Sequence, residues 1–152
     1  VQALEVPKHR LYLNFALDMA KKSLREGGLP IGAVMVIEDR IFYGHNQRVQ
    51  LLDPIAHAEI ACIRNAGLLL AKDYRKATLY STLSPCEMCS GVILLYKIPR
   101  IVIGEHKNFK GPEKYLWSRG VKIINLNDPE CVRLMRKFIL ANPKLWAADI
   151  GI

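Results

Sequence analysis

The order of apolar and polar positions predicts that the chain begins with a helix followed by a strand hairpin. From about Lys8 to Glu26, apolar residues recur at the spacing of one helical face: Leu11, Phe15, Ala16, Met19 and Ala20. Gly27-Gly28 then offers an end to this helix. Two apolar runs follow, Ile31–Ile37 and Ile41–Gly44, and the three polar residues between them predict a hairpin.

The rest of the chain alternates helices with strands. After a loop over residues 47–55, helices are predicted at 56–66, 85–97, 113–119 and 129–141, and strands at 77–82, 101–104 and 121–126. Pro85 suits a first helical turn, and Asp128-Pro129 marks a helix start. This alternation predicts an α/β sheet covered by helices on both sides. No repeat or linker interrupts the chain, so residues 1–152 are expected to form a single domain.

Composition narrows the class of protein. The 51% hydrophobic and 24% charged residues are typical of soluble globular domains, and the longest apolar runs fall far short of the ~18 residues of a membrane span. Val1–Glu5 lacks the features of a secretory signal, so we expect a cytoplasmic protein. The net charge of +8 comes from scattered lysines and arginines without a basic run, which argues against a dedicated nucleic-acid surface.

Two short segments 29 residues apart carry the most chemistry: His57-Ala58-Glu59 and Pro85-Cys86-Glu87-Met88-Cys89. A helix turns by about 100° per residue, so Cys86 and Cys89 share a face and can reach one ion. His57 and Glu59 would diverge inside a regular helix, and they converge only at an irregular first turn. The spacing predicts a zinc site between two helix N-termini, with His57, Cys86 and Cys89 as ligands.

This ligand set is typical of catalytic zinc, because three protein ligands leave the fourth tetrahedral position open. Water in that position can have its pKa lowered to about 7, and the positive helix ends would favour hydroxide and thiolate. Glu59, beside that water but not a ligand, could carry its proton to a substrate. The leading hypothesis is a hydrolytic enzyme with one catalytic Zn²⁺ per subunit.

Other interpretations of the two segments stay open. A lone Cys-x-x-Cys pair can be a redox dithiol, although that motif would not need the upstream His-x-Glu. A structural zinc site would need a fourth ligand, for which the candidates are Cys62, Cys131, His9, His45 and His106. The chain could also be a noncatalytic zinc-binding module, against which the intact Glu59 counts.

Three of those candidate ligands have a simpler interpretation. Cys62 and Cys131 are expected to be small buried apolar residues. His45 precedes Asn46 on an apparent strand and so points to the opposite face, where we expect a structural hydrogen bond.

The chain resembles the cytidine deaminase superfamily, whose signature combines His-x-Glu with Pro-Cys-x-x-Cys. More specifically, it resembles the yeast-type (fungal) cytosine deaminases over nearly its whole length. The matching stretches are Glu26–Gly32, Gly44–Asn46, Thr82–Cys89, Ile98–Arg100, Asn108–Lys110 and Trp146–Gly151. Two departures lie near the expected pocket: Ala58 stands where the fungal enzymes have glycine, and the segment after Phe109 is one residue shorter.

The resemblance implies a three-layer α/β/α sandwich with a central mixed sheet of about five strands, a homodimer, and a set of site residues. It assigns His57, Cys86 and Cys89 to zinc and Glu59 to proton transfer. The implied substrate contacts are Ile31, Asn46, Ala58, Leu83, Ser84, Phe109, Trp146 and Asp149. Among these, Asn46 would hydrogen-bond a pyrimidine, Phe109 and Trp146 would enclose its ring, and Asp149 would orient it. On composition alone, core packing is the favoured interpretation of the two aromatic residues, and a turn residue is an equal alternative for Asn46.

The function implied is hydrolytic deamination of a free pyrimidine base, cytosine to uracil with release of ammonia, as in pyrimidine salvage. Isocytosine is a competing substrate. The alternative enzyme is a transfer-RNA adenosine deaminase, which shares the His-Ala-Glu and Pro-Cys-x-Met-Cys strings and could use the basic surface. A flipped nucleotide needs an open pocket mouth, whereas a C-terminal lid that carries Trp146 and Asp149 would suit a free base.

Overall fold

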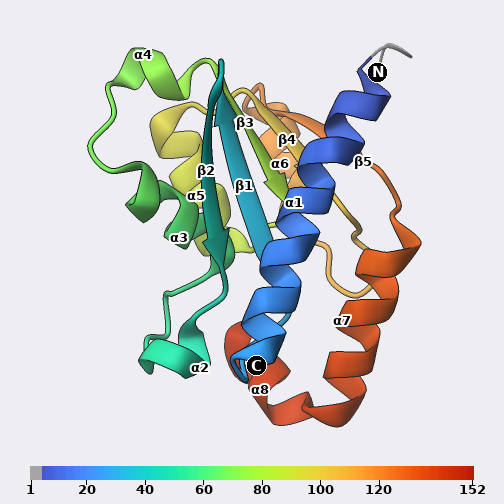
Figure 1. Cartoon of the computed structure of the whole chain (residues 1–152). Coiled ribbons are helices and arrows are strands. Elements are labelled where there is room, and N and C mark those ends of the chain that lie inside the picture. Colours follow the sequence, from blue (N-terminus) through green and yellow to red (C-terminus); the bar gives the residue numbers. More distant parts are fainter. Residues whose placement is uncertain (1–4) are drawn as a thin grey trace.

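The computed structural model describes residues 5–152; residues 1–4, part of the stretch without a predicted secretory signal, lie outside the described residues. The described chain folds around a sheet with the strand order β2-β1-β3-β4-β5 (Figure 1). β1 (Gly32–Ile37) pairs antiparallel with β2 (Arg40–His45) and with β3 (Ala77–Ser81). β4 (Arg100–Ile103) and β5 (Lys122–Asn125) continue parallel to β3. The sheet is therefore mixed, as expected, with the predicted hairpin at one edge.

Helices cover both faces of this sheet, which confirms the three-layer class. Alternate residues of a strand point to opposite faces, so β1 supplies both cores. Val34 and Val36 pack with Ala16 of α1 (Val6–Arg25), whereas Met35 and Ile37 pack with Ile93 of α5 (Glu87–Tyr96). The α1 face also carries α7 (Pro129–Ala141), and the α5 face carries α3 (Ala58–Ala66) and α6 (Glu113–Ser118) (Figure 1). α5 and α6 also make the crossovers that the parallel strands require.

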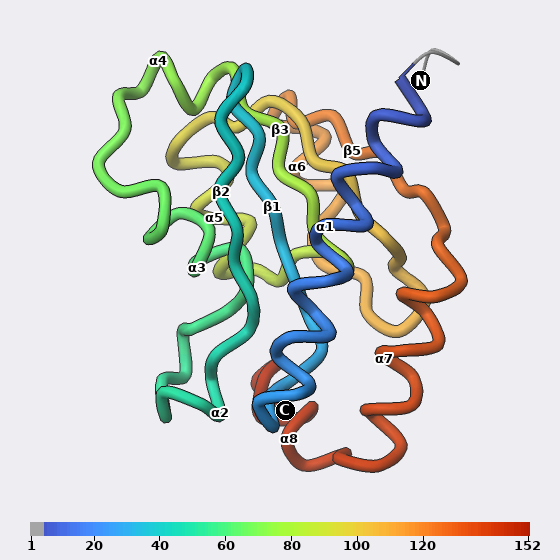
Figure 2. Tube along the Cα trace, in the orientation of Figure 1, coloured from blue at the N-terminus to red at the C-terminus, as the bar shows by residue number. Residues whose placement is uncertain are grey.

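One end of the sheet gathers segments from distant parts of the sequence. α8 (Pro143–Asp149) brings Trp146 against Leu29 and Ile31 at the start of β1. Figure 2 shows the C-terminal trace returning to this end, beside the loop that precedes β1. β3 ends here as well, followed by the Pro85–Cys89 segment. The fold therefore converges its motif-bearing loops on a single end of the sheet.

The structure also corrects several predicted details. Leu11 is half exposed, and the buried face of α1 instead carries Leu13 and Leu17 beside the predicted Ala16 and Ala20. Pro85 precedes the N-cap residue of α5 and so lies outside its first turn. The predicted 47–55 loop contains α2 (Arg48–Leu51), and α4 (Ala71–Tyr74) was not predicted. These helices have four residues each, too few to produce a helical period in the sequence.

The helix predicted at 129–141 is confirmed at both ends. Asp128 is its N-cap, and its Oδ1 accepts hydrogen bonds from the backbone nitrogens of Glu130 (2.9 Å) and Cys131 (3.0 Å). Among the residues that the structure describes, we find no helix with both the length and the apolarity needed to cross a bilayer.

Candidate active site

His57 and Cys86 occupy the same position on two different helices. His57 is the N-cap of α3 and Cys86 the N-cap of α5, and both have extended backbones, with ψ of 159° and 178°. The start of α3 packs directly against residue 44 of β2, which is a glycine. A Cβ at this position would collide with the backbone carbonyl of Ala58, so a larger residue would push α3 away from the sheet. The structure thus confirms that the His-x-Glu segment sits at an irregular helix start.

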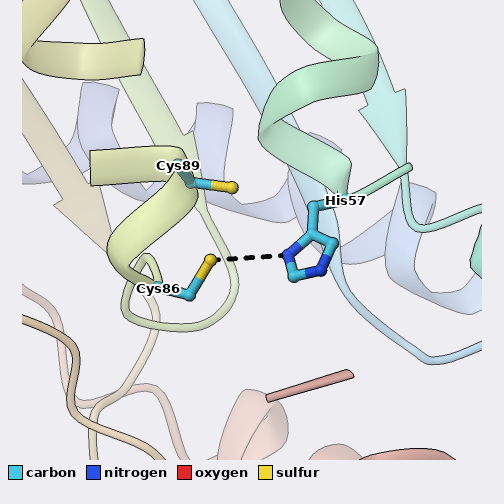
Figure 3. A group of neighbouring side chains, drawn as sticks. All are labelled: His57, Cys86 and Cys89. Atoms are coloured by element: carbon cyan, nitrogen blue, oxygen red, sulfur yellow. Dashed lines mark hydrogen bonds between the residues drawn. The ribbon is translucent and has the colours of Figure 1, made fainter. Parts of the chain in front are cut away.

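The three predicted zinc ligands come together between these helix starts (Figure 3). Their ligand atoms all lie within 4.8 Å of one another, and Nδ1 of His57 is 3.6 Å from Sγ of Cys86. Zinc bond lengths of about 2.3 Å to sulfur and 2.0 Å to nitrogen separate two tetrahedral ligand atoms by roughly 3.5 Å. The donor set and its spacing therefore fit one zinc ion.

The contacts among His57, Cys86 and Cys89 shift the pKa values of all three side chains. Burial would lower the pKa of His57, but its contact with Cys86 and the charges of Asp149 and Glu59 raise that pKa to about 9. The hydrogen bond with Cys89 lowers the pKa of Cys86 to about 4, while contact with Cys86 and burial raise that of Cys89. An anionic surrounding of this kind attracts a divalent cation, whose binding displaces the remaining protons.

Glu59 lies in the first turn of α3, beside the trio but outside the set of converging ligand atoms. Its side chain is buried, and burial raises its pKa to about 6, although the charge of His57 opposes that rise. Oε1 lies 3.5 Å from the hydroxyl of Ser81 at the end of β3. A carboxyl group with a pKa this close to neutrality can both accept and release a proton under physiological conditions.

A pocket beside the trio collects most of the predicted substrate contacts. Its lining residues are Ile31, Asn46, His57, Ala58, Glu59, Leu83, Ser84, Cys86, Phe109, Asp149 and Ile150. Trp146 does not line it and instead packs edge-on against Phe109, with ring centroids 6.0 Å apart. Ile150 was not predicted, and the only signal for it was its place in the Trp146–Gly151 match. The pocket encloses about 20 Å³, room for a water molecule but not for a base.

The polar end of the pocket is formed by Asn46 and Asp149. Asn46 is fully buried, and its backbone carbonyl accepts a 2.6 Å hydrogen bond from the Ser23 hydroxyl. Its Nδ2 donates to Oδ2 of Asp149 at 2.9 Å, and the same oxygen lies 3.6 Å from Nε2 of His57. Burial raises the pKa of Asp149, while His57 and Asn46 oppose that rise. The contacts of Asp149 thereby tie the C-terminal segment to the pocket wall, which Ile150 also lines.

The candidate fourth ligands for a structural zinc site lie elsewhere. Within residues 5–152, none of them joins His57, Cys86 and Cys89. Cys62 and Cys131 are buried free cysteines, as expected. The three histidines have other partners: Nε2 of His45 lies 2.8 Å from Glu26, Nδ1 of His9 lies 2.8 Å from the Tyr80 hydroxyl, and Nδ1 of His106 lies 3.2 Å from Glu113. The arrangement therefore favours a three-ligand site over a closed structural one.

Comparison with known proteins agrees with this geometry. The family described as the cytidine and deoxycytidylate deaminase zinc-binding region matches residues 6–105, which include all three candidate ligands and Glu59. A cytosine deaminase of Candida albicans is 50% identical over 141 residues, covering 91% of this chain and 94% of that protein. A tRNA-specific adenosine deaminase of Buchnera aphidicola is 35% identical over 150 residues, covering 90% and 91%.

A solved structure adds a likeness of fold. A tRNA:A34 deaminase that edits adenosine to inosine at the wobble position superposes with a TM-score of 0.69 at 28% identity, covering 82% of this chain and 99% of that one. The helix-covered mixed sheet is therefore shared with a deaminase that acts on RNA, so the fold by itself does not separate a free base from a nucleotide as substrate.

Proposed function

Because the chain belongs to the cytidine and deoxycytidylate deaminase family, we propose that it is a zinc-dependent hydrolase that deaminates a free pyrimidine base, with cytosine as its main substrate. The observation that carries this proposal is the meeting of His57, Cys86 and Cys89 beside the buried Glu59 in a small pocket. The reaction consumes cytosine and water and releases uracil and ammonia.

His57, Cys86 and Cys89 would hold one zinc ion per subunit, which when bound supplies a Lewis acid that activates water at neutral pH. Glu59 would accept the proton of the attacking water on its carboxylate and deliver it to the ring nitrogen. Glu59 would then take up the second proton of that water, from the hydroxyl group added to the ring carbon, and pass it to the amino group, which leaves as ammonia and leaves the carbonyl of uracil. The raised pKa of Glu59 supports this double role, because the same group must take up and release a proton in one turnover.

The remaining pocket residues would recognise the base. Phe109, backed by Trp146, offers an aromatic wall against a planar ring. Asn46 and Asp149 carry the amide and carboxylate groups that can hydrogen-bond a pyrimidine edge, and Ile31, Ala58, Leu83 and Ser84 would complete the walls. A base can enter only if one wall moves, and we propose that the C-terminal segment with Asp149 and Ile150 is that wall.

Transfer-RNA adenosine deamination is the second candidate, supported by the relative that is 35% identical and by the net charge of +8. Two observations favour the free base instead. Identity to the cytosine deaminase is higher at similar coverage, and the C-terminal segment supplies Asp149 and Ile150 to the pocket wall, where a flipped nucleotide would need room for its sugar and phosphates.

A substrate panel tests the proposal. Ammonia release by the zinc-loaded protein would be measured with cytosine, isocytosine, cytidine, guanine and an adenosine-bearing RNA hairpin. Turnover of cytosine is expected, with isocytosine as the main competitor. Turnover of the RNA alone would establish the second candidate, and bound zinc without turnover of any substrate would establish a noncatalytic zinc-binding module.

We further propose that the chain is a single deaminase domain, acts in pyrimidine salvage in the cytoplasm, and works as a homodimer. Exposed apolar side chains on the α5 face of the sheet, including Leu68, Leu95 and Trp117, support an interface there. Sedimentation giving a monomer of 17.2 kDa would contradict the dimer.

A further inference from the structure

The segment between Ser81 and Cys86 connects the two halves of the candidate active site. At its start, the Ser81 hydroxyl donates to the carbonyl of Leu83 (2.8 Å) and lies 3.5 Å from Glu59. At its end, Cys86 is a candidate zinc ligand. Ser84 lies in the middle and is itself buried in the pocket wall. A shift of this segment would move Ser81 relative to Glu59, the proposed proton-transfer residue, and would also move Cys86, a candidate zinc ligand.

The segment over residues 105–113, which ends at the first residue of α6, makes three hydrogen bonds with Ser84. The Ser84 backbone nitrogen donates to the Glu105 carbonyl at 3.1 Å. The Ser84 hydroxyl accepts a 3.0 Å hydrogen bond from the Gly111 nitrogen and donates a 2.6 Å hydrogen bond to Oε2 of Glu113. A serine hydroxyl has a single proton, and the short contact assigns that proton to the carboxylate. The Ser84 hydroxyl therefore has no second proton to donate to another group.

Glu113 is itself held in place. Its side chain is 11% exposed, and His106 approaches it from the outer side, with Nδ1 3.2 Å from both carboxylate oxygens. Gly111 fits tightly against Pro85, because a Cβ at residue 111 would collide with the Pro85 carbonyl. The same loop carries Phe109, so the contact between Glu113 and Ser84 joins the aromatic wall to the ligand-bearing segment.

We propose that Glu113 is a positioning residue for the deamination reaction, acting through the Ser84 hydroxyl to fix the Ser81–Cys86 segment against the Phe109 loop. Glu113 does not line the pocket and has no direct contact with the reacting atoms. Its effect on the rate would come from geometry, since small misplacements of catalytic groups cost large factors in rate. This inference rests on the proposed function, but the position of the segment can be measured without turnover.

A double-mutant cycle tests whether Glu113 acts through Ser84. Glu113→Ala, Ser84→Ala and the double variant would be compared in kcat and KM for cytosine and in hydrogen exchange of residues 82–86. Each single variant is expected to lower kcat roughly 10- to 100-fold with a smaller change in KM, and to speed exchange. The double variant should lose no more than the larger single loss, because both changes break one contact.

Further variants separate positioning from general damage. Glu113→Gln keeps an acceptor oxygen for the Ser84 hydroxyl and should recover most of kcat. Glu130→Gln, which removes an exposed carboxylate paired with Lys21, should leave kcat and exchange at wild-type values. If Glu113→Ala fails to fold, Glu113→Leu replaces it, since leucine retains much of the side-chain volume without an acceptor.

Losses that multiply in the double variant, or wild-type exchange of residues 82–86 in Glu113→Ala, would overturn the proposal. If the wild-type protein does not deaminate cytosine, the proposed function fails, but the exchange measurements still decide whether Glu113 clamps the segment.

Discussion

Two buried histidines at opposite ends of the sheet have pKa values shifted in opposite directions. His9 on α1 and His57 at the start of α3 are 3% and 7% exposed. Burial lowers the pKa of His9, with Arg100 and Lys8 adding to that effect against Glu5. At His57 burial acts in the same direction, but Cys86, Asp149 and Glu59 reverse it and raise the pKa to about 9. Burial thus penalises the imidazolium at both sites, and anionic neighbours decide which of them becomes cation-binding.

The surroundings of the two histidines differ in the same sense. The His57 pocket encloses about 20 Å³ and has thiol and carboxyl groups on its walls. The cavity at His9 encloses about 470 Å³, and its walls mix cations with anions: Glu5, Lys8, Glu38, Lys76 and Arg100. His9 is hydrogen-bonded to the Tyr80 hydroxyl, which is uncharged at neutral pH, and burial raises the pKa of Tyr80 further from that range. Of these two sites, as built from residues 5–152, the His57 site is therefore the one that offers a divalent cation a set of converging donors.

Replacing each histidine in turn is expected to give the largest difference between the two sites. His57→Ala is expected to lose bound zinc and to reduce deamination by roughly 10⁴-fold or more, since metal activation and proton transfer both fail. His9→Ala should retain zinc and most activity, and should lose about 1–3 kcal/mol of stability because the buried Tyr80 hydroxyl loses its partner. Metal analysis, ammonia release and urea unfolding measure these outcomes.

Equal zinc content in the two variants would contradict the assignment of the metal to the His57 site. Loss of zinc from His9→Ala, with the fold intact by circular dichroism, would show that the two ends of the sheet are coupled.

Replacing Glu59 tests whether this residue is needed for proton transfer but not for holding zinc. Glu59→Gln should keep zinc, because Glu59 is not one of the three converging ligands. It should lower kcat by about 10²- to 10⁴-fold, the usual contribution of a general acid–base group. Zinc analysis alongside initial rates measures both quantities. A variant that retains zinc and deaminates cytosine at the wild-type rate would show that Glu59 does not transfer the proton.

The sequence was sufficient to predict what local spacing controls. The helix at 129–141, the hairpin and the position of His57 at an irregular helix start followed from apolar periodicity, capping residues and the angle per helical residue. The convergence of His57 with Cys86 and Cys89 could be predicted because an imidazole and two thiols at this spacing are typical of a zinc site.

Sequence patterns could not predict contacts made by tertiary packing. Glu113 meets Ser84 across 29 residues. Ser84 directly precedes the Pro-Cys-x-x-Cys segment, but Glu113 belongs to no spacing motif that would indicate it as the partner of Ser84. Leu13 and Leu17 formed the buried stripe of α1 in preference to Leu11 because the sheet and α7, and not the helix itself, decide which face is covered. The small volume of the pocket likewise depends on where α8 and the C-terminal segment lie, which has no local signature.

The smallest predicted effect concerns the pH dependence of stability at His9. Its pKa is lowered in the folded protein from the ordinary value of 6.5, so near and below pH 6.5 the unfolded chain binds more protons there than the folded protein does. Stability should therefore fall as the pH is lowered from 7 to 5. The groups that affect this titration lie on four elements: Glu5 and Lys8 at the start of α1, Tyr80 on β3, Arg100 on β4 and Lys122 on β5.

His9→Gln keeps a partner for Tyr80 but cannot titrate, so its urea midpoint should change less over this range than that of the wild type. Other carboxyl and imidazole groups titrate equally in both proteins and cancel in the difference. Parallel pH profiles would mean that His9 takes up its proton as readily when folded as when unfolded, and the contrast with His57 would then not depend on the charges around each ring.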